Sequence, residues 1–149
     1  MDLLLDNSHI EFINNNLRLV LLSGDWISLR LPDKIRKVFP KADVISLGGA
    51  TEAAIWSIYY PIKDVDKNWL SIPYGYPLGN QKIYVLNYEK KLCPCGIEGE
   101  IYIGGQGVAE RYANDHEKTN DSFIQHKEFG KLYKTGDYGV MTSNRYIRI

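Results

Sequence analysis

Residues 45–53 have the sequence ISLGGATEA, in which an apolar strand runs directly into two glycines and a Thr-Glu pair. In open α/β sheets, ligands bind in the crevice at the carboxyl ends of such strands. Gly48 and Gly49 lack side chains, so their backbone can lie flat against a ligand ring or present N–H groups. Thr51 offers a hydroxyl, and Glu52 offers hard oxygens that suit Mg²⁺ held partly by phosphates. The stretch therefore indicates either a nucleotide-phosphate site with its metal or an ordinary strand and turn with an exposed glutamate.

The segment before this motif has the pattern of a βαβ unit. A near-continuous apolar run over residues 17–22 is typical of a strand covered on both faces, as in a parallel sheet. Pro32 and Asp33 suit the first turn of a short helix, and Pro40 ends it. Val44–Leu47 follows as a second buried strand.

From Ile72 onward, the pattern changes to short alternating strands separated by glycine turns. The expected strands are Lys82–Leu86, Glu100–Ile103, Lys131–Tyr133 and Arg145–Ile149. A short helix around Val108–Tyr112 and a polar stretch at Asn114–Asn120 interrupt them. The sequence thus predicts the α/β class: the end of a parallel α/β subdomain over residues 1–71, followed by a small antiparallel β-barrel-like subdomain over residues 72–149.

A second candidate motif is Tyr-Lys-Thr-Gly-Asp at residues 133–137. Gly136 allows a sharp turn after a short strand, and the Asp137 carboxylate can accept two hydroxyl hydrogen bonds at once. Carboxylates beyond strand ends commonly hold ribose diols. The alternative is an Asx-type turn in which Asp137 caps its own backbone.

A third stretch, residues 99–109, is rich in glycine but lacks both the GxGxxG spacing and the Gly-Lys-Ser/Thr of a P-loop. We interpret it as a barrel strand with a structural glycine corner.

Composition excludes several classes of protein. The chain has 149 residues, of which 44% are hydrophobic and 24% charged, as expected for a globular protein. Lys+Arg and Asp+Glu both number 18, so no basic excess indicates a nucleic-acid partner. The apolar run at Met1–Leu5 is interrupted by Asp2 and Asp6, which argues against a signal peptide or a membrane span. Cys93 and Cys95 flank one proline, a poor geometry for a disulfide, so free thiols and a cytoplasmic protein are predicted.

Taken together, the motifs resemble the adenylation domain of nonribosomal peptide synthetases, in the AMP-forming acyl/aminoacyl-adenylate superfamily. The resemblance is carried, in the family's order, by residues 17–27, 47–53, 72–80, 99–105 and 133–137. It covers nearly the whole chain and implies the C-terminal segment of the large core of an adenylate-forming enzyme.

The resemblance implies two catalytic residues: Thr51, which contacts the α-phosphate of ATP or of the adenylate, and Glu52, which is the Mg²⁺ ligand. The nucleotide-binding set that it implies is Gly48, Gly49, Ala50, Thr51 and Asp137. Within this set the glycine backbone lies against the adenine and Asp137 accepts the ribose hydroxyls. Part of the pocket for the amino-acid side chain is lined by Leu21, Ser23, Leu47, Ile55 and Trp56.

The sequence also departs from the family pattern. Many members have an aromatic residue where Gly48 stands and a proline where Ala50 stands, so adenine stacking by a side chain at position 48 is lost here. The family's phosphate loop ending in Pro-Lys-Gly, the aspartate that grips the substrate amino group and the C-terminal subdomain with its lysine are absent from the 149 residues. The segment alone is therefore expected to be inactive.

The implied function is formation of aminoacyl-AMP from ATP and an amino acid, with Mg²⁺ as cofactor, followed by loading onto the phosphopantetheine of a peptidyl carrier domain. The partners would be that carrier domain, the rest of the adenylation domain and other synthetase modules. Two alternatives remain open: a segment of an acyl- or aryl-acid-CoA ligase of the same superfamily, and a non-catalytic remnant that acts as an interaction scaffold.

Overall fold

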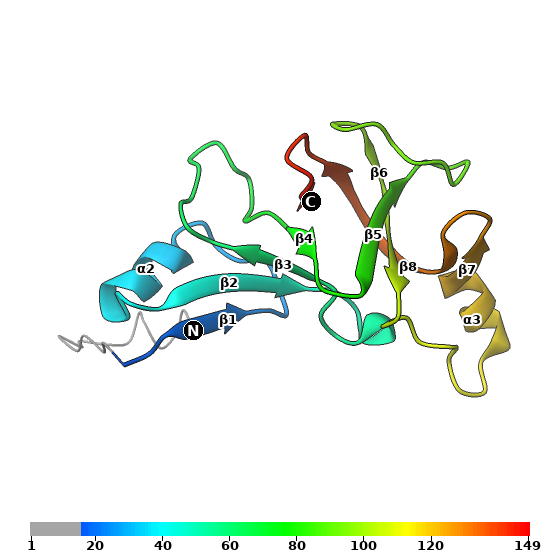
Figure 1. Cartoon of the computed structure of the whole chain (residues 1–149), viewed down its shortest axis with the longest axis horizontal. Helices are drawn as coiled ribbons and strands as arrows, with labels where there is room; N and C mark the ends of the chain where they lie inside the picture. Colours follow the sequence, from blue (N-terminus) through cyan, green and yellow to red (C-terminus); the bar gives the residue numbers. More distant parts are fainter. Residues whose placement is uncertain (1–15) are drawn as a thin grey trace. The chain divides into compact units, whose positions relative to one another are not determined.

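The computed structural model describes residues 16–149, so the prediction about Met1–Leu5 lies outside the described residues. The chain forms two compact units, each made of two stretches (Figure 1). Among the described residues, the first unit holds residues 16–46 and Tyr60–Ile72, and the second holds Leu47–Tyr59 and Pro73–Ile149. The subdomain boundary after residue 71 stays a prediction.

The first unit contains the predicted βαβ arrangement. Strand β1 (Leu19–Leu22) pairs in parallel with β2 (Asp43–Gly48), and helix α2 (Leu31–Val38) connects them. Pro32 occupies the first turn of α2, where its missing N–H costs nothing. The core of the unit consists of Val20, Leu22, Leu31, Ile35, Ala42, Val44, Ile62 and Ile72. The strands and helix predicted for this segment are confirmed.

Strand β1 differs from the expectation in one respect. Val20 and Leu22 are buried, whereas Leu19 and Leu21 are 46% and 47% exposed. Because side chains alternate along a strand, the second pair lies on the face of β1 opposite the core. Within residues 16–149, β1 therefore has one buried face and one exposed apolar face, and cover on both faces in the longer protein stays a prediction.

The second unit begins at Leu47, near the end of β2, with the glycine motif, and it includes the paired residues of a short antiparallel pair. The 3-10 helix η1 (Thr51–Ala53) follows β2, and β3 (Ile58–Pro61) pairs with β4 (Tyr76–Pro77) through Ile58↔Pro77 and Tyr59↔Tyr76.

The rest of this unit is a five-stranded antiparallel sheet with the order β5-β6-β8-β7, and β9 also pairs with β8 (Figure 1). The strands are β5 (Gln81–Leu86), β6 (Glu98–Gly105), β7 (Phe123–His126), β8 (Gly130–Met141) and β9 (Ile147–Arg148). Each predicted strand is present, two of them much longer than expected. Over residues 16–149 no closed barrel forms, so the predicted barrel-like subdomain is an open sheet. Residues 99–105 lie in β6, which ends at Gly105 with φ +104°, as the structural interpretation of this stretch requires.

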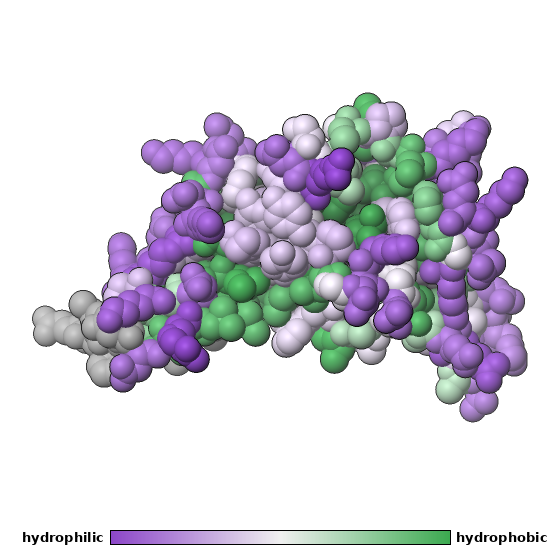
Figure 2. Space-filling view, viewed as in Figure 1, coloured by the Kyte–Doolittle hydropathy of each residue, from purple (hydrophilic) through white to green (hydrophobic). Residues whose placement is uncertain are grey.

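The helix of this unit is not where the sequence placed it. Helix α3 spans His116–Ser122, so it overlaps the polar stretch at Asn114–Asn120 and extends two residues beyond it, and residues 108–112 are not helical. Asp115 caps α3 by accepting a hydrogen bond from the Lys118 amide at 2.9 Å. The Ala109 amide donates a hydrogen bond to Glu52 O, and the Tyr112 amide donates one to Thr119 Oγ1. These two amides therefore do not make the hydrogen bonds of a helix over residues 108–112. No residue of α3 is buried, and Figure 2 shows hydrophilic side chains over it.

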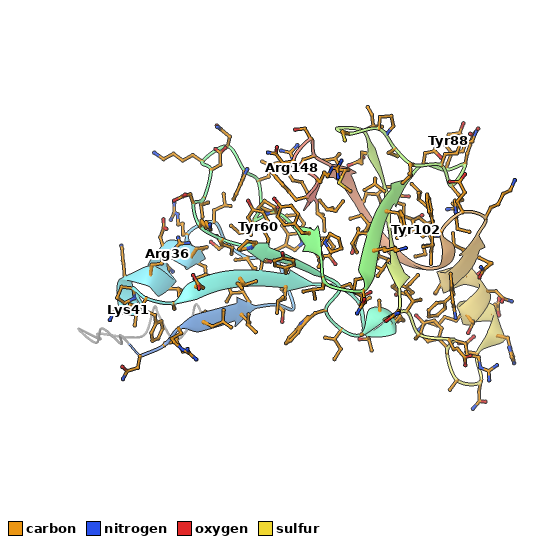
Figure 3. All side chains as sticks on the ribbon, viewed as in Figure 1. Arg36, Lys41, Tyr60, Tyr88, Tyr102 and Arg148 are labelled. Atoms are coloured by element: carbon orange, nitrogen blue, oxygen red, sulfur yellow. The ribbon has the colours of Figure 1, made fainter. Side chains whose placement is uncertain are left out.

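The two faces of the second sheet have different surroundings. One face packs in a cluster of Ala53, Ile58, Ile83, Val85, Ile101, Ile103 and Ile147, and the other carries Leu86, Tyr102 and Leu132. Tyr102, labelled in Figure 3, is fully buried and donates a 2.6 Å hydrogen bond to the buried Glu100 carboxylate. Lys90 and Lys134 lie 3.6 Å from that carboxylate and balance its charge.

Two further findings concern the cysteines and the helices. Cys93 and Cys95 are both free, as predicted. Among residues 16–149, no helix is long and apolar enough to cross a membrane.

Candidate functional site

The glycine turn after β2 is a tightly closed backbone structure. Gly49 has φ +145°, and a Cβ added to it would lie 2.6 Å from Ile55 O and from Ser57 N. Ser57 N also donates a 2.8 Å hydrogen bond to Gly48 O, which closes the loop. Both the backbone conformation and the lack of space therefore require glycine at position 49.

Gly48 is required for a different reason. A Cβ at this position would lie 2.0 Å from Cε2 of Tyr74, so the tyrosine ring fills the place of the missing side chain. Tyr74 is half-buried, and burial followed by the nearby charge of Asp137 raises its pKa to about 12, although a backbone hydrogen bond with Gly49 opposes the shift. Sequence reasoning assigned no role to Tyr74.

The Thr-Glu pair lies on η1, whose geometry separates the roles of the two side chains. Ala50 O accepts hydrogen bonds from the Ala53 and Ile55 amides, at 2.9 and 3.0 Å, and so holds the turn. Thr51 is exposed and Glu52 is half-buried. The turn thus presents a hydroxyl to solvent while it keeps the adjacent carboxylate against the protein.

The Glu52 carboxylate is held in its ionised form. Tyr112 Oη donates a 2.5 Å hydrogen bond to Glu52 Oε1. This bond lowers the pKa of Glu52 below its ordinary value of 4.5, with smaller contributions from Tyr133 and Lys118, against the opposing effect of burial. A carboxylate that stays charged near neutral pH can act as a ligand for a hard cation.

Tyr112 is itself fixed by the segment around α3. Its ring lies edge-on to Phe123, with centroids 5.5 Å apart, and Lys118 Nζ lies 4.3 Å from its centroid. Its amide donates to Thr119 Oγ1 at 3.0 Å. Tyr133, whose pKa is raised by burial, Tyr112 and Glu52, completes the group. The sequence argument missed Tyr112, which lies 60 residues from Glu52, and gave Tyr133 no role although it belongs to a quoted motif.

Removing the Tyr112 hydroxyl tests this arrangement. In Tyr112→Phe we expect the pKa of Glu52 to rise, because the largest cause of its lowering is gone. A carboxyl whose folded pKa is lowered stabilises the fold above its ordinary pKa and loses that contribution as pH falls through the folded pKa. The variant should therefore lose less stability on acidification below about pH 4.5. NMR titration of the Glu52 side chain and unfolding at several pH values measure both effects, and an unchanged pKa would refute the arrangement.

The Thr-Gly-Asp motif lies inside β8 and not beyond its end. β6 pairs Glu100 with Tyr138 and Tyr102 with Lys134, so residues 135–137 all lie opposite Ile101 and form a bulge. Thr135 Oγ1 donates to Ile101 O at 2.8 Å and accepts from Asp137 N at 3.1 Å. Gly136 has φ +82°, which suits the bulge.

The bulge corrects the expected strand-ending turn and leaves the Asp137 side chain exposed. The local side-chain-to-backbone hydrogen bond in this bulge runs from the Asp137 amide to the Thr135 hydroxyl. Partial burial raises the pKa of Asp137. Bulges commonly re-aim side chains next to ligand sites, and this one turns a carboxylate out of the regular alternation.

All the residues predicted to bind the nucleotide belong to the second unit. Tyr74 lies near the glycine turn and near Asp137, because its ring fills the space at Gly48 and the charge of Asp137 raises its pKa. The predicted pocket residues are divided. Leu21 and Ser23, both exposed, belong to the first unit. The second unit holds buried Leu47, with Ile55 and Trp56 63% and 42% exposed. The pocket assignment stays a prediction.

A magnesium ion fits this chemistry with Glu52 as a single protein ligand. Residues 16–149 contain no group of three or more His, Cys, Asp or Glu side chains that could hold a metal. Mg²⁺ is usually held by one or two carboxylates together with phosphates and water, so one ionised glutamate matches its needs beside a nucleotide.

Comparison with known proteins gives the family. The model of the family described as AMP-binding enzyme matches residues 1–113, and the chain belongs to this family. The chain is 65% identical over 135 residues to bacitracin synthase 1 of Bacillus licheniformis, an alignment that covers 91% of this chain and 3% of the relative.

Solved structures agree with this result. The nonribosomal peptide synthetase FmoA3 in its AMPPNP-bound form has a TM-score of 0.86 at 38% identity, covering 89% of this chain and 14% of FmoA3. PA1221, an NRPS protein containing adenylation and PCP domains, has a TM-score of 0.80 at 25% identity, covering 89% of this chain and 28% of PA1221. The resemblance to a segment of an NRPS adenylation domain, and the fold class that it implied, are confirmed. The chain spans only a small fraction of each of these relatives.

Proposed function

We propose that this segment holds ATP within an adenylation domain that converts an amino acid to aminoacyl-AMP. The observation that supports the proposal is that Thr51, Glu52 and Asp137 all belong to one compact unit, with the Thr51 hydroxyl exposed and the Glu52 carboxyl kept ionised by Tyr112. FmoA3 has been solved with AMPPNP and, at 38% identity and a TM-score of 0.86, with α-methyl-L-serine-AMP. These bound molecules support ATP and an amino acid as the substrates of the intact protein.

Each side chain has a distinct task in this proposal. Thr51 donates its hydroxyl hydrogen bond to the α-phosphate, and Asp137 accepts hydrogen bonds from the two ribose hydroxyls. Glu52 holds Mg²⁺, which when bound offsets the negative charge of the phosphates. These residues position ATP so that the amino-acid carboxylate can attack the α-phosphorus and pyrophosphate can leave. None of them forms a covalent bond with the substrate.

We also propose that the product is loaded onto the phosphopantetheine of a peptidyl carrier domain in a synthetase, in the cytoplasm. PA1221, which contains adenylation and PCP domains, supports the carrier partner. The two free thiols support a reducing compartment.

Substrate-dependent exchange of pyrophosphate into ATP by the intact protein tests the activity. A panel of amino acids, fatty acids and aryl acids should give exchange with one or a few amino acids. Exchange with aryl or fatty acids alone would favour the acyl-ligase alternative, and no exchange with any acid would favour the non-catalytic scaffold.

We expect the purified 149-residue segment to give no exchange above background. Positioning and charge neutralisation need groups on every side of the reacting phosphate, and the segment spans only 14% of FmoA3. Exchange assays at matched concentrations of the segment and the intact protein measure this, and amino-acid-dependent turnover by the segment would contradict the expectation.

A further inference from the structure

Position 48 and residue Tyr74 compete for one space. The ring atoms nearest to a Cβ on Gly48 are Cε2 of Tyr74, at 2.0 Å, and its two ring neighbours, each at 2.8 Å. Contacts this short do not occur in folded proteins, so the Cε2 edge of the ring lies where a side chain of residue 48 would begin. A side chain at position 48 and an aromatic ring reaching from position 74 therefore exclude each other.

The backbone on both sides of Tyr74 is fixed. Pro73 is fully buried, and Gly75 exchanges two hydrogen bonds with Ile147: Gly75 N donates to Ile147 O at 3.0 Å, and Ile147 N donates back at 2.8 Å. The Tyr74 ring also packs against the cluster that contains Ala53 and Ile58. Tyr74 thus lies in an irregular segment just before β4, held on one side by the buried Pro73 and on the other by the Gly75–Ile147 pair.

The ring remains half-buried. The charge of Asp137 and the Gly49 backbone both act on the pKa of its hydroxyl, so both lie near that end of the side chain. A fixed aromatic ring between a side-chain-free turn and a carboxylate has the features that a purine nucleoside needs: a flat apolar surface for the base and an acceptor for the sugar.

We propose that Tyr74 provides the aromatic contact for the adenine ring of ATP, in the space that Gly48 leaves open. This assignment deepens the proposed function and rests on it. It explains why a glycine at position 48 is compatible with adenine binding: the aromatic surface comes from the segment before β4, and the glycine makes room for it.

The test exchanges the two positions in the intact protein. Tyr74→Ile removes the ring, and Gly48→Tyr combined with Tyr74→Ile returns a ring from the other side of the same space. We expect Tyr74→Ile to raise the KM for ATP roughly tenfold, because it removes the stacking of an aromatic ring on the base. The KM for the amino acid should stay unchanged. Tyr74→Phe should keep a near-normal KM for ATP, and the double variant should recover most of the loss.

Two further variants make the result specific. Gly48→Tyr alone places two side chains in one space, so it should lower the melting temperature, and Tyr74→Ile should relieve this loss. Tyr84→Ile is the matched control, since Tyr84 is also half-buried but packs in the cluster on the opposite sheet face. It should leave the KM for ATP unchanged.

The outcomes separate this inference from the function on which it rests. An unchanged KM for ATP in Tyr74→Ile, or equal rises in both KM values, would overturn the role of Tyr74 and leave the proposed function standing. Absence of any ATP dependence in the wild-type protein would overturn both.

Discussion

Replacing Glu52 with glutamine should reduce Mg-ATP-dependent pyrophosphate exchange by the intact protein about tenfold or more. The amide keeps an oxygen that can accept the Tyr112 hydrogen bond, so the local fold is expected to survive. It lacks the negative charge that a hard divalent cation requires, and charge-assisted contacts are roughly twice as strong as neutral ones. The loss should be partly offset at high Mg²⁺ concentration, because weaker metal binding can be compensated by mass action.

Glu117→Gln provides the matched control for this experiment. Glu117 lies on the exposed helix α3. Its replacement by glutamine removes the same charge from the same unit and leaves Tyr112 and its hydrogen bond to Glu52 in place. It should leave exchange and its Mg²⁺ dependence unchanged. If Glu52→Gln behaves like Glu117→Gln at limiting Mg²⁺, then Glu52 is not a metal ligand.

The second large effect is expected at Asp137, whose replacement should weaken ATP binding without a loss of stability. Asp137→Asn should weaken ATP binding about ten- to a hundredfold, since hydrogen bonds to a charged group contribute about 1.5–3 kcal/mol. Partial burial raises the pKa of Asp137, which means that folding disfavours its charged form. An acid with a raised folded pKa costs stability above that pKa, and the cost disappears at lower pH, below its ordinary value of 3.8.

Asp137→Asn should therefore leave the melting temperature at pH 7 unchanged or slightly raised, and this difference should vanish in acid. Calorimetric titration of the intact protein with ATP and thermal unfolding at two pH values measure the two quantities. Asp121→Asn on α3 controls for the loss of charge. A lowered melting temperature with unchanged ATP affinity would show that Asp137 serves the β8 bulge and not the nucleotide.

The local pattern of the sequence predicted those elements whose signal is periodic. The apolar run at 17–22, the proline-bounded helix and the alternating strands of the second sheet each satisfy one dominant rule, and the structure contains all of them. Helix α3 was not predicted because its residues, HEKTNDS, have no buried face and therefore show no hydrophobic period. Its strongest signal was Asp115, an N-cap residue placed just before it.

The missed parts of the candidate site depend on contacts between distant residues. Tyr112 reaches Glu52 from 60 residues away, and nothing in the sequence around either residue records that contact. The bulge at residues 135–137 resembles a turn in sequence because both need a glycine with positive φ. The missing side chain at Gly48 leaves a space that another residue can fill, but the sequence does not show which residue fills it. Only the folded chain places the Tyr74 ring there.

The central claim is that Thr51, Glu52 and Asp137 hold one Mg²⁺-bound adenosine phosphate. The measurement that tests it most directly is a crystal structure of the intact protein with a non-hydrolysable ATP analogue and Mg²⁺. The account predicts a Glu52 carboxylate oxygen at about 2.0–2.1 Å from the metal and the Asp137 carboxylate within about 3 Å of both ribose hydroxyls. A nucleotide bound at full occupancy with neither carboxylate in contact would contradict it.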